Sequence, residues 1–425
     1  MVDVALILEM NPWRDNPDVI KFDEHVKKAM NKKNKLLYEF KKESSLIFVG
    51  PRRVGKTTFF KLLIYDLLIH KKKQPKNIVY ISCEILQNHM DLIDVFRFID
   101  AKYFFLDEVT FLSGWEKSLK WAIDQGLLEN KIVYVTGSST AFLKREAFPG
   151  RNIRFIPFTP LNFLQYCRLF GSVSLKEKLE HMQSIEELLP NYSEIFKLFV
   201  NYMESGGFPK PAFELSEGGK IPWETYEEIY SWFRGDILKL GKSEEIMKGL
   251  IIRLLQTLST PISYHSIGKW IGITHRIVRE YIETLKNLMY LDLLYQIDLG
   301  KMIPLIRREK KIYFTDPFIV RALEKTVVGR KIVDESKMAE LIAFNTFKLA
   351  RNIYFLKRNM KTDFLVNSVK IEVKWQEKTT PRKGTIILSK KDYNKEKNIF
   401  PLPLYLLWFL KKKTKDPKDL FIKPE

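Results

Sequence analysis

The stretch SLIFVGPRRVGKTTFFKLLIYDLL, residues 45–68, decides the fold of the first part of the chain. Its apolar residues 46–49 predict a short buried strand, and the run that continues to about His70 predicts a helix. Between them, residues 50–57 fit the pattern G-x-x-x-x-G-K-[ST] in the strand-loop-helix context that a phosphate-binding loop requires. We therefore expect an α/β fold with a P-loop NTPase core built on a parallel sheet.

The loop meets the physical demands of nucleotide binding in order. Glycines let backbone N–H groups close around phosphate oxygens at a helix N-terminus. We expect Lys56 to neutralise the β- and γ-phosphates of ATP and the Thr57 hydroxyl to bind Mg²⁺. The predicted nucleotide-binding residues of this loop are Gly50, Pro51, Arg52, Arg53, Val54, Gly55, Lys56, Thr57 and Thr58.

Two later apolar runs end in residues suited to hydrolysis. Residues 103–106 predict a strand that leads into Asp107 and Glu108; Asp107 would support the Mg²⁺ shell and Glu108 would polarise the attacking water. The segment KIVYVTGSS, residues 131–139, predicts a third strand. Ser138 and Ser139 at its end are candidates for sensing the γ-phosphate, although serines at a strand end are also ordinary turn residues.

Length and charge limit the class of protein. A chain of 425 residues suggests roughly three domains. The formal net charge is +20, and residues 331–425 carry 22 Lys and Arg residues against 11 Asp and Glu residues. This bias predicts a polyanionic partner, DNA, whereas the alternative is a heavily charged surface that serves solubility.

The sequence indicates a cytoplasmic protein with no membrane partner. The longest apolar run, PLPLYLLWFL at residues 401–410, is half the length of a bilayer span and predicts a buried strand. The N-terminus has no basic-then-apolar signal region, and Cys83 and Cys167 have no metal-like spacing.

Residues 260–291 read as a helix-turn-helix. Ser263 begins a short helix, Gly272 makes the turn, and Thr274 caps a second helix with one apolar stripe. The other face of the second helix carries His275, Arg276, Arg279, Glu280 and Lys286. Two strands around a basic wing follow, so this segment predicts either a DNA-reading module or a plain packing module.

The stretch TDFLVNSVKIEVKW, residues 362–375, predicts a hairpin that turns at Asn367 and Ser368. In that register one face is apolar, and Asp363 lies opposite Glu372 on the other face. Like charges placed opposite each other weaken a sheet, unless a divalent cation between them makes them a ligand pair. A purely structural alternative is that Lys370 and Lys374 neutralise both acids without any metal.

Taken in order, the motifs GPRRVGKT, FFLDE, VTGSS, FPGR (148–151), ESGGFP (204–209) and IYFTDP (312–317) resemble archaeal ATPases of the AAA+/STAND type. The resemblance implies a parallel sheet with the Walker A and Walker B motifs on adjacent strands, then a helical lid and a winged helix. It makes Arg151 a candidate arginine finger or sensor, in its own subunit or in a homo-oligomeric neighbour; the alternative is a surface arginine at a helix end. The glycines at residues 206–207 suit a hinge between helices.

The hairpin resembles the active-site arrangement of the PD-(D/E)xK nuclease superfamily. The resemblance implies Asp363 and Glu372 as ligands of a second Mg²⁺ or Mn²⁺, Lys374 as a catalytic residue, and Glu340 on a preceding helix as a further metal ligand. Thr362, not proline, precedes Asp363 in this chain.

These patterns together predict four domains. They are a P-loop ATPase core (1–158), a helical lid (159–245), a winged helix (246–325) and a C-terminal restriction-endonuclease-like α/β domain (326–425). The predicted function is ATP hydrolysis coupled to DNA binding, with metal-dependent nuclease activity in the last domain. The alternative is a signalling switch whose C-terminal modules are non-catalytic.

Overall fold

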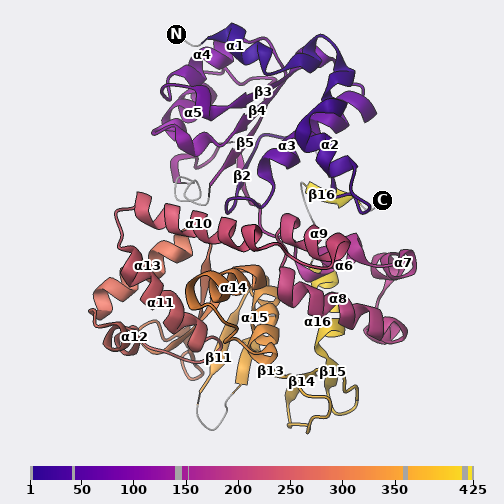
Figure 1. Cartoon of the computed structure of the whole chain (residues 1–425), viewed down its shortest axis with the longest axis vertical. Coiled ribbons are helices and arrows are strands. Elements are labelled where there is room, and N and C mark those ends of the chain that lie inside the picture. Colours follow the sequence, from indigo (N-terminus) through magenta and orange to yellow (C-terminus); the bar gives the residue numbers. More distant parts are fainter. Residues whose placement is uncertain are drawn as a thin grey trace. The chain divides into compact units, whose positions relative to one another are not determined.

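The computed structural model describes residues 3–40, 44–138, 146–151, 153–357, 362–413 and 420–423 (Figure 1). The chain forms two compact units. Unit 1 comprises Met1–Thr159 and Pro417–Glu425, and unit 2 comprises Pro160–Asp416. The predicted winged helix, the predicted lid from Pro160 onward and the predicted nuclease-like domain up to Asp416 fall in unit 2, whereas residues 417–425 of the last domain belong to unit 1. The finer division of unit 2 stays a prediction.

A five-stranded parallel sheet forms the centre of unit 1, in the order β3-β4-β5-β2-β6. Its strands are β2 (Leu46–Val49), β3 (Ile78–Ser82), β4 (Tyr103–Asp107), β5 (Ile132–Gly137) and β6 (Arg154–Pro157). Every residue of β2 and β4 is buried, as the continuous apolar runs of these segments predict for parallel strands. The strands predicted from the three motifs are confirmed.

The order of the strands corrects one expectation. The Walker A strand β2 and the Walker B strand β4 are not adjacent, because β5 pairs with both of them. Sheet order does not follow chain order, so the sequence could not show that the third motif strand inserts between the other two. The insertion places the end of β5 between the phosphate-binding loop and Asp107.

The helices of unit 1 are α1 (Val4–Glu9), α2 (Glu24–Met30), α3 (Lys56–Tyr65), α4 (Asp91–Phe98) and α5 (Trp115–Asp124). A π-helical turn, Asp66–His70, extends α3 to the predicted end of that helix. Strand β1 (Leu37–Phe40) pairs antiparallel with β16 (Leu420–Lys423), so the last described segment of the chain belongs to unit 1.

Unit 2 begins with helices. They are α6 (Phe163–Phe170), α7 (Val173–His181), α8 (Tyr192–Ser205), α9 (Pro209–Gly218), α10 (Trp223–Lys239) and α11 (Glu244–Gln256). Gly206 follows the last residue of α8, and its φ of 57° is in the left-handed region.

The junction after α8 is packed, which argues against the hinge expected there. A Cβ atom at Gly207 would lie 1.9 Å from the carbonyl oxygen of Leu161. The Gly207 N–H donates to Asp316 at 2.8 Å, and Asp316 also accepts from the N–H of Phe318 at 2.8 Å. The motifs ESGGFP and IYFTDP therefore contact each other, and the glycines are needed for close approach.

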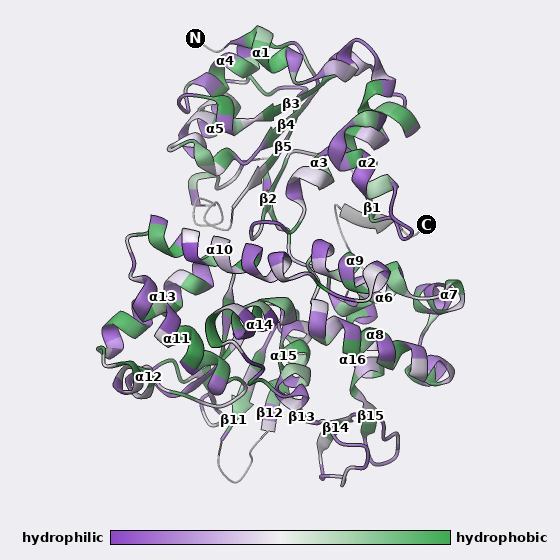
Figure 2. Cartoon of the chain, in the orientation of Figure 1, coloured by the Kyte–Doolittle hydropathy of each residue, from purple (hydrophilic) through white to green (hydrophobic). Residues whose placement is uncertain are grey.

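The predicted helix-turn-helix is present. Helices α12 (Tyr264–Ile271) and α13 (His275–Asn287) are capped by Ser263 and Thr274, and Gly272 has a φ of 85° between them. Both helices carry hydrophilic and hydrophobic residues along their length (Figure 2). Strands β7 (Leu291–Tyr295) and β10 (Lys310–Phe314) follow as an antiparallel pair. The chain between them forms a second, short antiparallel pair, β8 (Ile297–Asp298) and β9 (Ile303–Pro304).

The remaining chain forms a second five-stranded sheet, in the order β11-β12-β13-β14-β15. Its strands are β11 (Ile353–Leu356), β12 (Thr362–Val366), β13 (Val369–Lys374), β14 (Thr385–Ser389) and β15 (Ile399–Pro401). The first three strands are antiparallel, and β13, β14 and β15 are parallel. The helices of this part are α14 (Pro317–Leu323), α15 (Glu335–Phe347) and α16 (Leu402–Lys413).

The apolar run 401–410 is a helix, α16, so the strand predicted there is wrong. A short apolar run that is buried on all sides has no period that separates strand from helix. Leucine predominates in the run and β-branched residues are absent from it, a composition that favours a helix. Pro403 is tolerated because it lies in the first turn, where no intrahelical N–H bond is lost.

Candidate functional site

The phosphate-binding loop runs from the end of β2 to the start of α3. Gly50 has to be glycine, because a Cβ atom there would lie 1.9 Å from the carbonyl oxygen of Phe158. Gly55, at the N-terminus of α3, has a φ of 96°. Lys56 is buried, and its ammonium group donates to the carbonyl oxygens of Gly50 at 3.2 Å and Pro51 at 3.1 Å. The loop thus holds the lysine where an anionic phosphate would be neutralised.

Asp107 and Glu108 at the end of β4 are positioned by hydroxyl groups. Asp107 accepts from the Tyr80 hydroxyl at 2.8 Å and from the Thr136 hydroxyl. The Thr136 hydroxyl in turn accepts from the Glu108 N–H at 2.9 Å. Glu108 adopts a left-handed conformation with φ 53°, and its carboxylate lies 3.5 Å from the ammonium group of Lys56. A left-handed glutamate is uncommon and costs energy, so its occurrence here fits a functional position.

These residues fit a magnesium-nucleotide complex. Thr57 at the start of α3 could bind the metal directly, and Asp107 could accept from its water ligands. Mg²⁺ would neutralise charge on the phosphates. Burial and the Asp107 charge raise the pKa of Tyr80, so that this hydroxyl stays protonated as a donor to the carboxylate.

Sequence reasoning missed the residues that brace this site. His25 of α2 contacts the Thr58 hydroxyl at 3.1 Å, and Lys61 of α3 pairs with Asp23 at 3.3 Å. Thr136 gave a weak signal, since it is the polar residue near the end of an apolar strand and directly precedes Gly137 of the VTGSS motif. Tyr80, in the middle of β3, gave none. His25 and Asp23 gave none, because they precede the loop by more than one element.

The other candidate residues of the ATP site are Ser138, Ser139 and Arg151. The N–H of Ser138 donates to the Thr110 hydroxyl at 3.2 Å, and Ser139 lies outside the described residues. Arg151 makes a double contact with Asp124 at the end of α5, with both distances 2.8 Å. This is the geometry of the alternative reading, in which Arg151 binds a helix end. Its role as an arginine finger stays a prediction.

In unit 2, the predicted hairpin register is confirmed. Phe364 pairs with Ile371 and Val366 with Val369, and Asn367 and Ser368 both have positive φ, as a two-residue type I′ turn requires. Extending this register places Asp363 across from Glu372.

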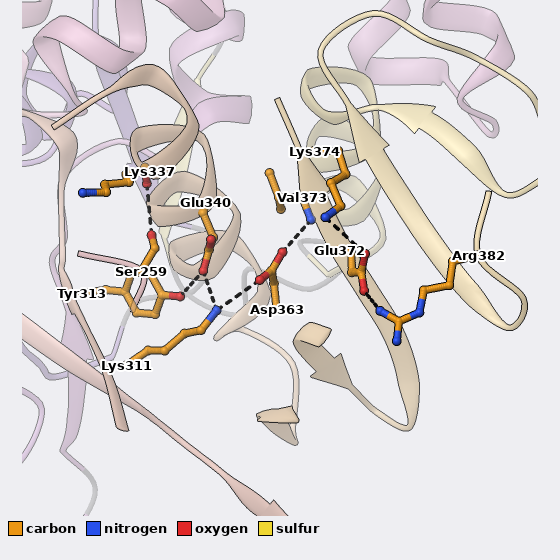
Figure 3. Close-up of polar contacts among 10 residues, drawn as sticks. All are labelled: Ser259, Lys311, Tyr313, Lys337, Glu340, Asp363, Glu372, Val373, Lys374 and Arg382. Atoms are coloured by element: carbon orange, nitrogen blue, oxygen red, sulfur yellow. Dashed lines mark hydrogen bonds and ion pairs between the residues drawn. The ribbon is translucent and has the colours of Figure 1, made fainter. Parts of the chain in front are cut away.

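Glu340 and Asp363 share one cation, Lys311 (Figure 3). The Lys311 ammonium lies 2.7 Å from Glu340 and 3.3 Å from Asp363, and the Tyr313 hydroxyl donates to Glu340 at 2.6 Å. Burial lowers the pKa of Lys311, but the two carboxylates outweigh it, so its pKa is raised. Burial and the charge of Asp363 raise the pKa of Glu340 to about 7.

Glu372 faces different cations. Its carboxylate is paired with Arg382 and lies 3.7 Å from Lys374 (Figure 3). The second oxygen of Asp363 accepts from the N–H of Val373 at 3.0 Å. The three carboxylates thus face three cations, and within the described residues no group of three or more His, Cys, Asp and Glu side chains could hold a metal ion.

The arrangement does not fit the divalent cation that the nuclease resemblance implies. A metal between Glu340 and Asp363 would have to displace the ammonium group already bonded to both. The sequence gave little sign of Lys311, because it stands in the run RREKK, which reads as part of a basic wing. One signal was present: Lys311 and Tyr313 are two residues apart on one strand, so their side chains lie on the same face of it.

The helix-turn-helix presents a group of arginines. A pocket of about 470 Å³ lies between the start of α12, helix α13 and the segment before β10. It is lined in part by Arg279, Arg307, Arg308 and Lys310, with Glu283 as its acidic residue. Over the residues that the structure describes, the side chains of Arg276, Arg279, Arg307 and Arg308 have no hydrogen bond or ion pair. Glu280, by contrast, is paired with Lys242.

Comparisons with known proteins agree with the nucleotide site. Residues 42–167 match the family model of an AAA domain, and residues 196–328 match that of a domain of unknown function, DUF8612. The chain therefore contains an AAA-type P-loop domain, and this match supports nucleotide binding and hydrolysis by the chain. Among curated proteins, none matches the chain.

Two solved structures of RuvB variants from Thermotoga maritima were also found, each 14% identical to the chain. Each alignment covers 68% of this chain and 89% of the RuvB chain, with TM-scores of 0.27 and 0.24. Scores this low do not establish a shared arrangement. Among the described helices, none is both long and apolar enough to cross a bilayer.

Proposed function

We propose that the protein binds ATP with Mg²⁺ and hydrolyses it at the P-loop of unit 1. The observation that carries this proposal is the 3.5 Å contact between the Lys56 ammonium group, at the start of α3, and the Glu108 carboxylate, directly after β4. Lys56 binds the phosphates, and Glu108 accepts a proton from the attacking water. Thr136 orients both acids by donating to Asp107 and accepting from the Glu108 backbone.

Two variants test this proposal. Lys56→Ala is expected to abolish ATP binding, because the neutralising charge is lost. Glu108→Gln keeps the shape of the side chain but cannot accept the proton, so kcat is expected to fall about 100-fold or more while ATP binding persists. Equilibrium binding of a fluorescent ATP analogue and phosphate release measure the two effects separately. Unchanged turnover in Glu108→Gln would contradict the role given to Glu108.

We further propose that the helix-turn-helix and its strands act as a winged helix that binds DNA. The arginines around the pocket support this proposal, because exposed guanidinium groups that form no ion pair within the described part of the chain are suited to phosphate contacts. They come from α13 and from the segment before β10, so a backbone that crosses the turn could meet both elements.

A matched set of variants tests the DNA proposal. Arg279→Ala/Arg307→Ala is expected to weaken binding of duplex DNA, and to flatten the dependence of log K on log[salt] by about 0.9 for each phosphate that the variant no longer neutralises. Arg330→Ala/Arg351→Ala removes the same charge outside the pocket and serves as the control. Fluorescence anisotropy at several salt concentrations gives both slopes. Equal losses in the two pairs would mean that only net charge matters.

DNA that stimulates the ATPase at low salt, with the stimulation lost at high salt, would couple the two activities. The alternative is a signalling switch, for which no nucleic acid would stimulate turnover. Metal-dependent cleavage by Asp363, Glu372 and Lys374 stays a prediction, as do homo-oligomer formation and a cytoplasmic location. The cation pairing of the carboxylates favours a domain that does not cleave.

A further inference from the structure

The cation between Glu340 and Asp363 comes from outside the sheet that carries Asp363. Lys311 belongs to β10, which pairs with β7 in a separate sheet. Its side chain is only 5% exposed, and it reaches one carboxylate on α15 and one on β12. Three elements thus supply the groups of one ion cluster (Figure 3).

The surroundings of the Lys311 ammonium group leave it dependent on these two acids. Its nitrogen lies 5.9 Å from the ring centre of Phe355 and 5.7 Å from that of Phe364. A buried lysine is rare unless it is paired, and removing one partner of such a pair leaves an uncompensated charge. The same holds for the carboxylates, since Glu340 and Asp363 have side chains 13% and 19% exposed.

Charge balance distinguishes this cluster from a metal site. A divalent cation between the carboxylates of Glu340 and Asp363 would add positive charge where Lys311 already supplies it. The cation and the Lys311 ammonium group, both within contact distance of the same two carboxylates, would repel each other. The third acid, Glu372, is balanced separately by Arg382 and Lys374. No carboxylate of the hairpin is left in need of a metal.

We propose that Lys311 takes the place of the divalent cation between Glu340 and Asp363, so that this part of unit 2 does not bind the metal that hydrolytic cleavage would need. The ammonium group joins α15, β10 and β12 in the way that a structural metal would join them. The proposal is independent of ATP hydrolysis and of DNA binding by the helix-turn-helix.

Mn²⁺ binding in the absence of nucleotide, measured by electron paramagnetic resonance, tests the proposal. The wild type and Glu340→Gln/Asp363→Asn are expected to bind the same amount of Mn²⁺, because the wild-type carboxylates are occupied by Lys311. Lys311→Met is expected to bind about one additional ion per chain, because two carboxylates are then left without a cation. Glu340→Gln/Asp363→Asn/Lys311→Met is the control that removes the charge of all three groups.

An ion that the wild type binds and Glu340→Gln/Asp363→Asn/Lys311→Met loses would overturn the proposal. This comparison holds even if Lys311→Met does not fold, because the triple variant leaves no unpaired charge in the cluster. Thermal unfolding gives a second readout. The Tm shift that Mn²⁺ causes in Glu340→Gln/Asp363→Asn/Lys311→Met is the baseline. Mn²⁺ is expected to raise the Tm of Lys311→Met above this baseline and to shift the Tm of the wild type no more than the baseline. Mn²⁺-dependent cleavage of linear DNA by the wild type, abolished by Asp363→Asn, would equally refute it.

Discussion

Asp316 shows how one carboxyl group joins distant parts of unit 2. It is fully buried, caps the N-terminus of α14, and accepts hydrogen bonds from the N–H groups of Gly207 and Phe318. Burial raises its pKa to about 7, although the two N–H donors and Lys348 oppose the shift. The sequence marked this residue only as part of the motif IYFTDP, because a contact across more than a hundred residues leaves no local pattern.

The raised pKa predicts how stability depends on pH. An unfolded aspartate has a pKa of about 3.9, so between about pH 4 and pH 7 the unfolded chain loses this proton while the folded chain keeps it. The folded state therefore binds more protons, and this contribution to stability is full below pH 4 and is lost as pH rises to 7. Relative to Asp316→Asn, the free energy of unfolding of the wild type is expected to fall by about 1.4 kcal/mol for each unit that the pH rises across this window.

Urea unfolding of both proteins at several pH values measures this difference. Asp316→Asn also loses one acceptor and is expected to be less stable by about 1–3 kcal/mol at low pH. That offset does not change with pH, so the slope alone reports the titration. Parallel curves for the two proteins would show that the pKa of Asp316 is not raised.

At the scale of elements, the sequence was most informative where a local rule acts alone. The strand-loop-helix around Lys56, the caps at Ser263 and Thr274, and the turn at Asn367 were predicted because neighbouring residues determine them. The place of β5 in the sheet and the helical conformation of α16 were not predicted, since both depend on burial by segments that are distant in the sequence. Of the cations beside the hairpin carboxylates, Lys374 was among those expected from the sequence, but Arg382 and Lys311 were missed. Lys311 comes from another sheet, so no local pattern pointed to it.

The junction between α8 and α9 gives a prediction for an element boundary. Gly207→Ala would place a Cβ atom against the carbonyl oxygen of Leu161, and backbone cannot move aside as a flexible side chain can. We expect a loss of about 3 kcal/mol or more in the free energy of unfolding.

Gly235, in the interior of α10, is the matched control, since a Cβ atom there meets nothing within 4 Å. Gly235→Ala is expected to stabilise the protein by about 0.5–1 kcal/mol, because alanine favours the helix. Chemical unfolding measures both variants. Similar effects at the two positions would show that the junction has more room than the structure gives it.

At the scale of the whole molecule, the chain leaves unit 1 after Thr159 and returns to it at Pro417. The returning strand β16 pairs with β1 in a sheet separate from the five-stranded sheet. Deleting residues 417–425 is therefore expected to remove the hydrogen-exchange protection of amides in β1 while the protection of β2 and β5 persists. Exchange measured by mass spectrometry on peptides from these strands checks this, and a loss of protection in β2 would contradict it.

The return of the chain to unit 1 also bears on synthesis. A ribosome makes the nucleotide-binding sheet first, and domains generally fold in the order in which they emerge. The partner of β1 emerges only after all of unit 2 has been translated, so unit 1 has to wait for its last strand. A chain whose translation stops before β16 would carry a folded P-loop beside a β1 strand without its partner, and the backbone N–H and C=O groups that β16 pairs would be exposed.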